Sequence, residues 1–492
     1  MIKNFKWLLL VSLSFVACNN DDESSVAVEV PVTSGTASFT KYVALGDSFA
    51  AGYSDGALFK KGQEGSYVNI LAEQFVTAGG GDFKTPFTSD NLGGLLLGGN
   101  VIAGTRLYFK VSTSSPTPVA GVPTTEVTTK ITGPFSNLGV PGAKSYHLIA
   151  PGYGNVAGVA TGAANPYFAR FATASGTTVL ADALVQAPTF FSLWIGGNDV
   201  LGYATSGGVG VNQTGNLNPA TYGGNDITDP NVFASVYSGL VAKLTANGAK
   251  GVVANLPYVN TLPYFTTVPH NPVPLTAGAA TQLNAGYATY NGGLQFAAAN
   301  GLITAAEATR RTVKFVAGSN AVVIVDSYLT NLSAYGIPSY RQATAEDLPV
   351  LTSRTFIGTV VGGNPAAVNG VSVPLADQWI LTKDEIAEVK VATDAYNVTI
   401  KTIADAKGLA FVDTKAIMTQ LSSKAGIVSN SFTLSSTYVT GGAFSLDGVH
   451  PGPRGYALIT NAFMAAINAQ FSSTLKPVDL SKYPILYPAV IQ

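Results

Sequence analysis

Cysteine is almost absent from this sequence: Cys18 is the only one among 492 residues. No disulfide can form within the chain, so the fold must be stable without one. Histidine is nearly as scarce, with three residues in the chain and no HExxH motif. Such a set is a poor source of metal ligands, so we expect no metal ion, and no motif indicates another cofactor. We expect His147 and His270 to be packing or surface residues.

Charged residues are also few. They make up 11% of the chain, less than half of the usual share. The 27 lysines and arginines nearly balance the 28 aspartates and glutamates. Because a nucleic-acid-binding protein carries a clustered excess of positive charge, we expect no nucleic-acid partner. After Cys18 no apolar run is long enough to span a membrane.

The first 17 residues have the features of a secretory signal peptide. Positive charge comes first, and the apolar stretch Trp7 to Ala17 is too short to cross a bilayer as a mature helix. Phe15-Val16-Ala17-Cys18 resembles the lipobox of bacterial lipoproteins, in which the cysteine is lipidated and becomes the first mature residue. We therefore expect Cys18 to anchor the protein in the cell envelope, at the outer membrane, facing the periplasm or the cell surface.

Residues 18–39 are mostly polar or β-branched and predict a flexible tether, because such a segment cannot bury a core. The acidic cluster Asp21-Asp22-Glu23 resembles the surface-export signal of some bacterial lipoproteins. A solvated linker is the other interpretation of the same residues.

The stretch Lys41 to Asp55, KYVALGDSFAAGYSD, is the one around which the chain is organised. Its apolar run predicts a buried parallel strand that stops at Gly46-Asp47-Ser48. Ser48 would then lie at the carboxyl end of a strand, the edge at which open α/β sheets bind ligands, and it is a candidate nucleophile. The alternative is that Asp47 or Ser48 only caps the helix that follows.

Three later stretches favour the nucleophile: Asn137 to Ala143, Gly196 to Asp199 and Asp447 to Pro451. Together with the first stretch they resemble the four blocks of the GDSL, or SGNH, family of serine esterases and lipases. One departure is that Phe49 stands where the family name has leucine. That position is apolar packing beside the nucleophile.

This resemblance implies a catalytic site. Ser48 would attack an ester carbonyl, His450 would take its proton, and Asp447 would orient His450. The oxyanion hole would consist of the backbone N–H groups of Ser48 and Gly142 and the side-chain amide of Asn198. No metal takes part in this chemistry.

Apolar runs that alternate with helical patterns predict an α/β fold with a parallel sheet covered on both faces. The family resemblance implies a three-layer α/β/α sandwich with a flavodoxin-like, five-stranded sheet. We expect strands at 42–45, 189–195, 250–256 and 409–413, and helices at 66–77, 178–186, 229–247, 275–300, 305–313, 382–407 and 454–471. We expect the hydrolase domain to span residues 40–475, with insertions near 78–130, 202–228 and 331–378 and a C-terminal tail at 476–492.

Three functions remain open. A lipase-like acylhydrolase would use an apolar groove, which Leu95–Leu97 and Tyr108–Phe109 could supply. A carbohydrate acetyl esterase would use a polar and aromatic pocket, which the loop Gly202–Thr228 with Tyr258 and Tyr264 could supply. A surface lipoprotein that binds a glycan or lipid without catalysis is the third. We favour the acylhydrolase, because nothing in the chain marks a carbohydrate module.

Overall fold

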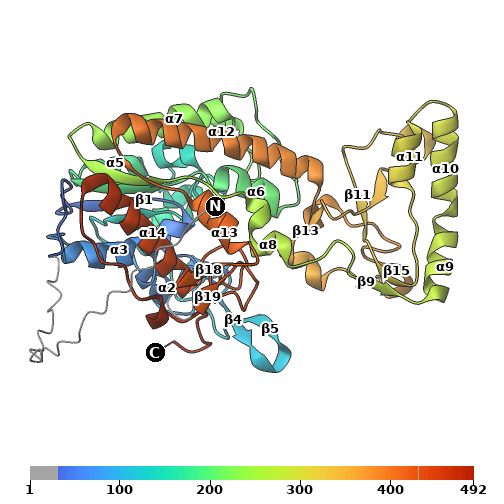
Figure 1. The fold of residues 1–492 in the computed structure, drawn as a ribbon, viewed down its shortest axis with the longest axis horizontal. Coiled ribbons are helices and arrows are strands. Elements are labelled where there is room, and N and C mark those ends of the chain that lie inside the picture. Colours follow the sequence, from blue (N-terminus) through green and yellow to red (C-terminus); the bar gives the residue numbers. More distant parts are fainter. Residues whose placement is uncertain (1–30, 430–431, 492) are drawn as a thin grey trace, which may run out of the picture. The chain divides into compact units, whose positions relative to one another are not determined.

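The computed structural model describes residues 31–429 and 432–491, and its central element is a five-stranded sheet (Figure 1). The strands lie in the order β6 (Asn137–Gly139), β1 (Tyr42–Gly46), β7 (Phe190–Trp194), β8 (Lys250–Ala254) and β17 (Ala410–Val412). All of them pair in parallel. Numbered along the chain, the order is 2-1-3-4-5, that of flavodoxin-like folds. The strand order reverses between β1 and β7, and open α/β sheets bind ligands at such a point.

The strands explain why site residues can gather at one edge. Every residue of β1 and β7 is buried, as expected for parallel strands covered on both faces. Gly46, the last residue of β1, pairs with Gly139 of β6 and with Trp194 of β7. The three strands therefore end at the same level, and the residues that follow them emerge side by side.

Helices cover both faces of the sheet, which confirms the three-layer sandwich (Figure 1). On one face α3 (Tyr67–Val76) packs against α14 (Pro453–Phe471). On the other face lie α5 (Val179–Leu184), α7 (Pro230–Thr245) and α12 (Lys383–Lys407). The shorter helices outside residues 273–380 are α1 (Ser48–Ala51), α2 (Lys60–Glu64), α4 (Pro166–Ala169), α6 (Asn198–Thr205), α8 (Pro263–Thr266) and α13 (Thr414–Leu421).

The longest helix, α12, follows the sequence rules closely. Thr382 and Glu385 form a capping box at its start, in which the Glu385 carboxylate accepts the Thr382 N–H at 2.7 Å. Its buried residues recur every three or four positions, as in Val389, Ala392 and Tyr396. Gly408 ends the helix in the left-handed conformation, with φ of 59°.

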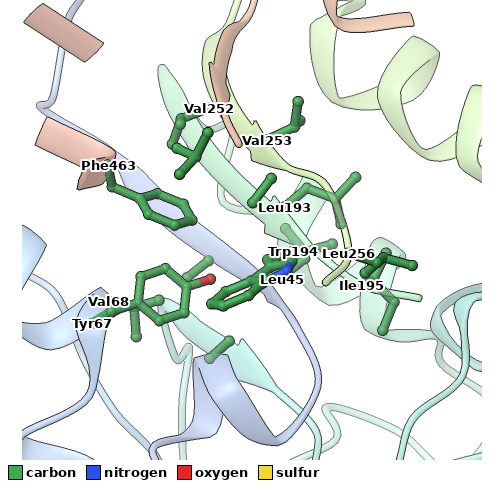
Figure 2. Packing of buried hydrophobic residues seen from close by; sticks show 14 of the residues in the cluster. Leu45, Tyr67, Val68, Leu193, Trp194, Ile195, Val252, Val253, Leu256 and Phe463 are labelled. Atoms are coloured by element: carbon green, nitrogen blue, oxygen red, sulfur yellow. The ribbon is translucent and has the colours of Figure 1, made fainter. Parts of the chain in front are cut away.

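Large aromatic side chains pack together with aliphatic ones in the main core (Figure 2). Trp194 lies beside Tyr67 and Phe463, with ring centroids 5.6 and 6.0 Å apart. The indole N–H of Trp194 donates to the Asn255 carbonyl at 3.2 Å, so its one polar atom is satisfied inside the core. The end of β7 is therefore fixed by packing rather than by solvent-exposed contacts.

The first insertion forms two small antiparallel hairpins. Their strands are β2 (Leu95–Leu97), β3 (Asn100–Ala103), β4 (Leu107–Lys110) and β5 (Ser115–Pro118). Leu95 is buried together with Val127 and Ala169 in a cluster separate from the main core. A third hairpin, late in the chain, pairs β18 (Ile427–Ser429) with β19 (Phe432–Leu434).

A longer segment, residues 273–380, builds two hydrophobic clusters of its own. The insertion expected at 331–378 is its second half. We call residues 273–380 the inserted segment. In it, buried Arg341 contacts Asp326 at 2.5 Å and Asp347 at 2.6 Å. Its elements are β9 (Val273–Leu275), α9 (Ala277–Gly286), α10 (Ala288–Ala299), α11 (Ala305–Arg311), β10 (Gly318–Asn320), β11 (Val323–Val325), β12 (Tyr340–Gln342), β13 (Leu348–Pro349), β14 (Val360–Val361), β15 (Asn364–Val368) and β16 (Ile380–Leu381).

The expected tether is too long at its C-terminal end. The Thr33 N–H donates to the Thr474 hydroxyl at 2.8 Å, and Phe39 is buried in the main core. The tether must therefore end before Thr33 rather than at residue 39. The expected signal peptide, residues 1–17, and Cys18 lie outside the described residues.

The C-terminal tail packs onto the first insertion. Arg106 donates to the carbonyls of Pro488 and Ala489 at 2.7 and 3.0 Å, and Tyr487 is buried. In the part of the chain that the structure covers, no helix combines the length and the apolar character needed to cross a membrane.

Candidate active site

Ser48 is separated from the end of β1 by Asp47 alone and is the first residue of the short helix α1. The Asp47 carboxylate caps this helix by accepting the Phe49 N–H at 3.0 Å. Burial raises the pKa of Asp47 to about 7, although the bond from Phe49 and the charge of His450 oppose this rise. The capping role that we weighed as an alternative therefore belongs to Asp47, and the Ser48 hydroxyl is free for another partner.

The three residues expected to form a triad lie in one hydrogen-bonded chain. Ser48 Oγ is 2.8 Å from His450 Nε2, and His450 Nδ1 is 2.9 Å from Asp447 Oδ2. Because an ionised carboxylate can only accept, Nδ1 must carry the proton of the neutral ring. Nε2 is then the acceptor for the Ser48 hydroxyl, as a general base requires.

The Asp447 carboxylate is held by more than His450. Its Oδ1 accepts the N–H groups of Val449 and His450 at 2.9 and 2.8 Å, and its Oδ2 accepts the Gly56 N–H at 3.0 Å. Burial works against the charge, but the charge and the hydrogen bonds of His450, with the Val449 N–H, lower the pKa of Asp447 to about 2. The carboxylate is therefore ionised at all but strongly acidic pH.

Two aromatic side chains flank the imidazole of His450. The ring of Tyr53 is 4.7 Å from it and the ring of Phe49 is 5.3 Å from it, centroid to centroid. Phe49 also lies 4.7 Å from Trp194. Phe49 is thus the packing residue that we expected, and it joins the histidine to the core below the site.

Asp55 and its neighbour Ser54 fasten the loop that carries Asp447. The Asp55 N–H donates to Ser445 Oγ at 3.0 Å, and its carboxylate accepts the Leu446 N–H at 2.9 Å. Ser54 Oγ donates to the Pro451 carbonyl at 3.1 Å. Sequence reasoning missed both residues. The available signal was Asp55-Gly56 immediately after the first block, a pair typical of a tight turn.

The second block holds α1 against the sheet. The Asn137 amide donates to the Ala50 carbonyl at 3.0 Å, and its oxygen accepts the Gly139 N–H at 3.0 Å. A Cβ on Gly139 would lie 2.3 Å from the nitrogen of Ala51, so only glycine permits this close approach. The helix that begins with Ser48 is therefore positioned by β6 as well as by β1.

The loop that carries Gly142 is hydrogen-bonded to the start of α6. Gly142 has a φ of 80°, and a Cβ built on it would meet no atom within 4 Å, so the space on that side of its Cα is open. Asn198 begins α6, and its Nδ2 donates to the Ala143 carbonyl at 3.0 Å. A carboxamide nitrogen carries two N–H bonds, so one remains for another acceptor.

A buried carboxylate fixes the relative position of these loops. Asp199, next to Asn198, accepts the hydroxyl of Ser145 at 2.7 Å and its N–H at 2.8 Å. Burial raises the pKa of Asp199, and the two bonds from Ser145 and the charge of Lys144 oppose the rise. Lys144 in turn donates to the Asp226 carbonyl at 2.6 Å.

The two remaining histidines lie away from this chain of residues. His147 is five positions after Gly142 in the sequence, and its Nδ1 accepts the Lys144 N–H at 3.0 Å. The His270 carbonyl accepts the Val322 N–H at 3.0 Å, at the start of the inserted segment. No group of three or more histidine, cysteine, aspartate or glutamate side chains among residues 31–429 and 432–491 could hold a metal ion.

The fold and the site define a doubly wound α/β protein with a Ser–His–Asp arrangement at the carboxyl edge of its sheet. No protein-family model matches the chain. No curated protein matches it either.

Solved structures with a similar arrangement of chain include three hydrolases. An acetylxylan esterase from Geobacillus stearothermophilus is 11% identical, with a TM-score of 0.32 over 88% of this chain and 96% of its own. An extracellular lipase from Streptomyces rimosus is 12% identical, with a TM-score of 0.29 over 88% and 99%. A phospholipase A1 from Streptomyces albidoflavus NA297 is 14% identical, with a TM-score of 0.29 over 88% and 100%. The likeness is weak, and the function proposed below rests on the geometry of the site.

Proposed function

We propose that this protein is a serine-dependent ester hydrolase of the GDSL, or SGNH, kind. The observation that supports the proposal is the hydrogen-bonded chain from Ser48 through His450 to Asp447. A buried, ionised carboxylate, a neutral imidazole and a hydroxyl in this order are what nucleophilic attack on an ester requires.

In the first half of the reaction, Ser48 Oγ attacks the ester carbonyl carbon while its proton passes to His450 Nε2. The tetrahedral intermediate then collapses, the bond to the alcohol oxygen breaks, and His450 returns the proton to that oxygen. The alcohol leaves, and the acyl group stays on Ser48. Asp447 stabilises the imidazolium while it exists, and its low pKa keeps it from taking the proton itself.

In the second half, a water molecule takes the place of the alcohol. His450 accepts a proton from the water, whose oxygen attacks the acyl carbon, and the bond to Ser48 Oγ breaks as the proton passes to it. The products are a carboxylic acid, an alcohol and the original enzyme. Neither half needs a metal ion.

The negative charge on the carbonyl oxygen needs donors in both halves. Ser48 opens a helix, so its N–H is among the first-turn N–H groups that have no partner within the helix. Gly142 and the second N–H of the Asn198 amide are the other two donors in this proposal. Each such donor typically stabilises the transition state by about 3 kcal/mol.

Replacement of the nucleophile tests the proposal. The wild-type protein should hydrolyse p-nitrophenyl acetate and butyrate and react with a fluorophosphonate probe, and Ser48→Ala should lose both activities. Ser333→Ala, which alters an exposed serine of the inserted segment, is the control. Turnover and labelling of Ser48→Ala at the wild-type level would disprove the role of Ser48. A folded wild-type protein without either activity would favour the non-catalytic binding lipoprotein.

We also propose that the enzyme is held at the outer membrane by lipid on Cys18. The support is the sequence alone: a signal-like apolar stretch followed by Phe15-Val16-Ala17-Cys18. Two or more acyl chains make such an anchor stable, whereas one chain gives only marginal binding.

A further inference from the structure

A cavity of about 600 Å³ is lined by residues of the loop that follows Gly142. The Gly202–Thr228 loop contributes Tyr222 to its wall, and the first insertion contributes Leu97 and Ile102. From the sequence alone, the first insertion favours an acyl chain as substrate and the Gly202–Thr228 loop favours a sugar. The structure instead brings them to one cavity.

Aromatic rings form much of the cavity wall. The imidazole of His147 stacks on the ring of Tyr153, with centroids 4.3 Å apart and an interplanar angle of 13°. Tyr146 meets His147 edge-on at 4.4 Å and also meets Tyr222 edge-on at 5.7 Å. The four rings all line the cavity, and they support one another in fixed orientations.

His147 is a neutral hydrogen-bond donor in this wall. Its Nδ1 accepts the Lys144 N–H at 3.0 Å, so the ring proton must be on Nε2. Burial, together with the charge of Lys144, lowers the pKa of His147 to about 4, which keeps the ring neutral near pH 7. Within the part of the chain that the structure describes, Nε2 has no hydrogen-bond partner.

The cavity is connected to the proposed oxyanion hole through a short loop. Asn165, which also lines the cavity, donates to the Pro141 carbonyl at 2.8 Å and contacts the Tyr153 hydroxyl at 3.1 Å. Gly142 comes next in the chain, and Ala143 accepts the amide of Asn198. One loop therefore carries an oxyanion donor and, a few residues on, the ring of His147.

We propose that this cavity binds the sugar part of an acylated glycan, with Nε2–H of His147 donating to a sugar oxygen. The inference rests on the proposed ester hydrolysis and names its substrate class. A sugar ring presents an apolar C–H face, which suits a wall of aromatic rings, and hydroxyl groups, which suit a few fixed donors.

The lining also disfavours phospholipid esters. It contains no lysine, arginine, aspartate or glutamate, so it offers no counter-charge to a phosphate headgroup. Leu95, which was expected in an apolar groove, is buried in its own cluster, and neither Tyr108 nor Phe109 lines the cavity. The two other tyrosines expected beside a sugar have different roles: Tyr258 bonds to Asp394, and the Tyr264 hydroxyl donates to a backbone carbonyl.

A selectivity measurement tests the proposal. We would compare kcat/KM for peracetylated cellobiose, p-nitrophenyl acetate and p-nitrophenyl octanoate. His147→Phe keeps an aromatic ring but removes both the Nε2–H donor and the Nδ1 acceptor of the Lys144 N–H, and Tyr222→Ala removes an aromatic ring from the wall. In each variant, kcat/KM for the sugar ester divided by kcat/KM for p-nitrophenyl acetate should fall by at least about tenfold. This is the effect of one lost hydrogen bond or stacking contact. His147→Gln, which keeps an N–H donor, should restore part of the ratio, and the matched control His270→Phe should leave it unchanged.

A binding measurement separates this proposal from the proposed catalysis. The Ser48→Ala protein should bind the acetylated disaccharide in calorimetric titration, and the double variant Ser48→Ala/His147→Phe should bind it at least about tenfold more weakly. An unchanged selectivity ratio in both folded cavity variants would overturn the sugar site. So would a kcat/KM that climbs from acetyl to octanoyl esters with no turnover of the sugar ester. Either result would leave the role of Ser48 intact, because that role is judged on p-nitrophenyl acetate and the fluorophosphonate probe.

Discussion

The carboxylate of Asp55 accepts the backbone N–H of Leu446 at 2.9 Å, across 391 residues of chain. Asp55 holds this position in the left-handed region, with a φ of 52°, which aspartate tolerates better than most residues. Its neighbour Gly56 donates to Asp447. The turn that follows Ser48 therefore holds the loop that carries Asp447 and His450.

Asp55→Ala should lower activity without unfolding the protein. Loss of the side chain removes the bond to Leu446, so Asp447 and His450 should be less well positioned for Ser48. We expect kcat to fall by about 10- to 100-fold, since small misplacements in an active site have costs of this size. Asp55→Asn keeps an acceptor oxygen and the tolerance of positive φ, and it should recover most of the activity. Equal rates of fluorophosphonate labelling in the alanine variant and the wild type would contradict this role.

Asn198→Ala should affect the transition state more than substrate binding. We expect kcat to fall by about 10²- to 10³-fold with a smaller change in KM, because the amide would donate to charge that develops only during reaction. Steady-state kinetics with p-nitrophenyl butyrate would measure the effect. Asn218→Ala, at an exposed position of the loop after α6, is the matched control. A change confined to KM would show that Asn198 only binds substrate.

The raised pKa of Glu385 predicts how the free energy of unfolding depends on pH. Burial raises its pKa from 4.5 to about 7, against the opposing bonds from Thr382. The folded state thus holds the proton more tightly than the unfolded state, so the contribution of Glu385 is complete below about pH 4.5 and is lost as the pH rises toward 7. The unfolding free energy of the wild type should therefore fall between pH 4.5 and 7. In Glu385→Gln this fall should be smaller by on the order of 2 kcal/mol. Urea denaturation at several pH values would measure it, with the exposed Glu346→Gln as control. Parallel curves for wild type and Glu385→Gln would refute the prediction.

Cys18→Ala should release the protein from membranes. Without the lipidated cysteine the proposed anchor is lost, and the protein should move to the soluble fraction while its esterase activity is kept. Globomycin should likewise leave an uncleaved precursor of the wild type. Ser24→Ala, outside the lipobox-like residues, is the control. A wild-type protein that is soluble and retains Met1 would disprove the anchor.

The long strands could be predicted from the sequence because the pattern that marks each of them lies within the strand itself. Phe190 to Trp194 is buried throughout and is apolar at every position except Ser192, which is the pattern of a strand covered on both faces. β6 has only three residues and begins with the polar Asn137, so its membership of the sheet depends on pairing with β1. That pairing cannot be seen in the three residues themselves.

The inserted segment could not be recognised as a unit for a similar reason. Its helices α9 and α10 are rich in alanine and glycine, and their sequences do not indicate what they pack against. What separates them is that their buried residues contact one another and not the main core. Which hydrophobic cluster a helix joins is decided by contacts between residues that are distant in sequence.

The site was predictable where a side chain acts through its own chemistry. Ser48 and His450 were named from short motifs and lie 2.8 Å apart. Asp55 and His147 were missed because their roles depend on partners: Asp55 on a loop near the other end of the chain, and His147 on the Lys144 N–H that fixes its tautomer and on the stacked ring of Tyr153. Residue type alone does not carry that information.

Ser48 and His450 are separated by 402 positions, so they come from opposite ends of the chain. During synthesis the hydroxyl therefore has no base to take its proton until the last part of the sequence has been made and has folded back onto β1. If the chain crosses a membrane unfolded, it would be inactive before it crosses, and Ser48 and His450 would come together only after it has crossed and folded. For a hydrolase of this kind, the order of assembly would delay activity until the chain is complete, without a separate inhibitor.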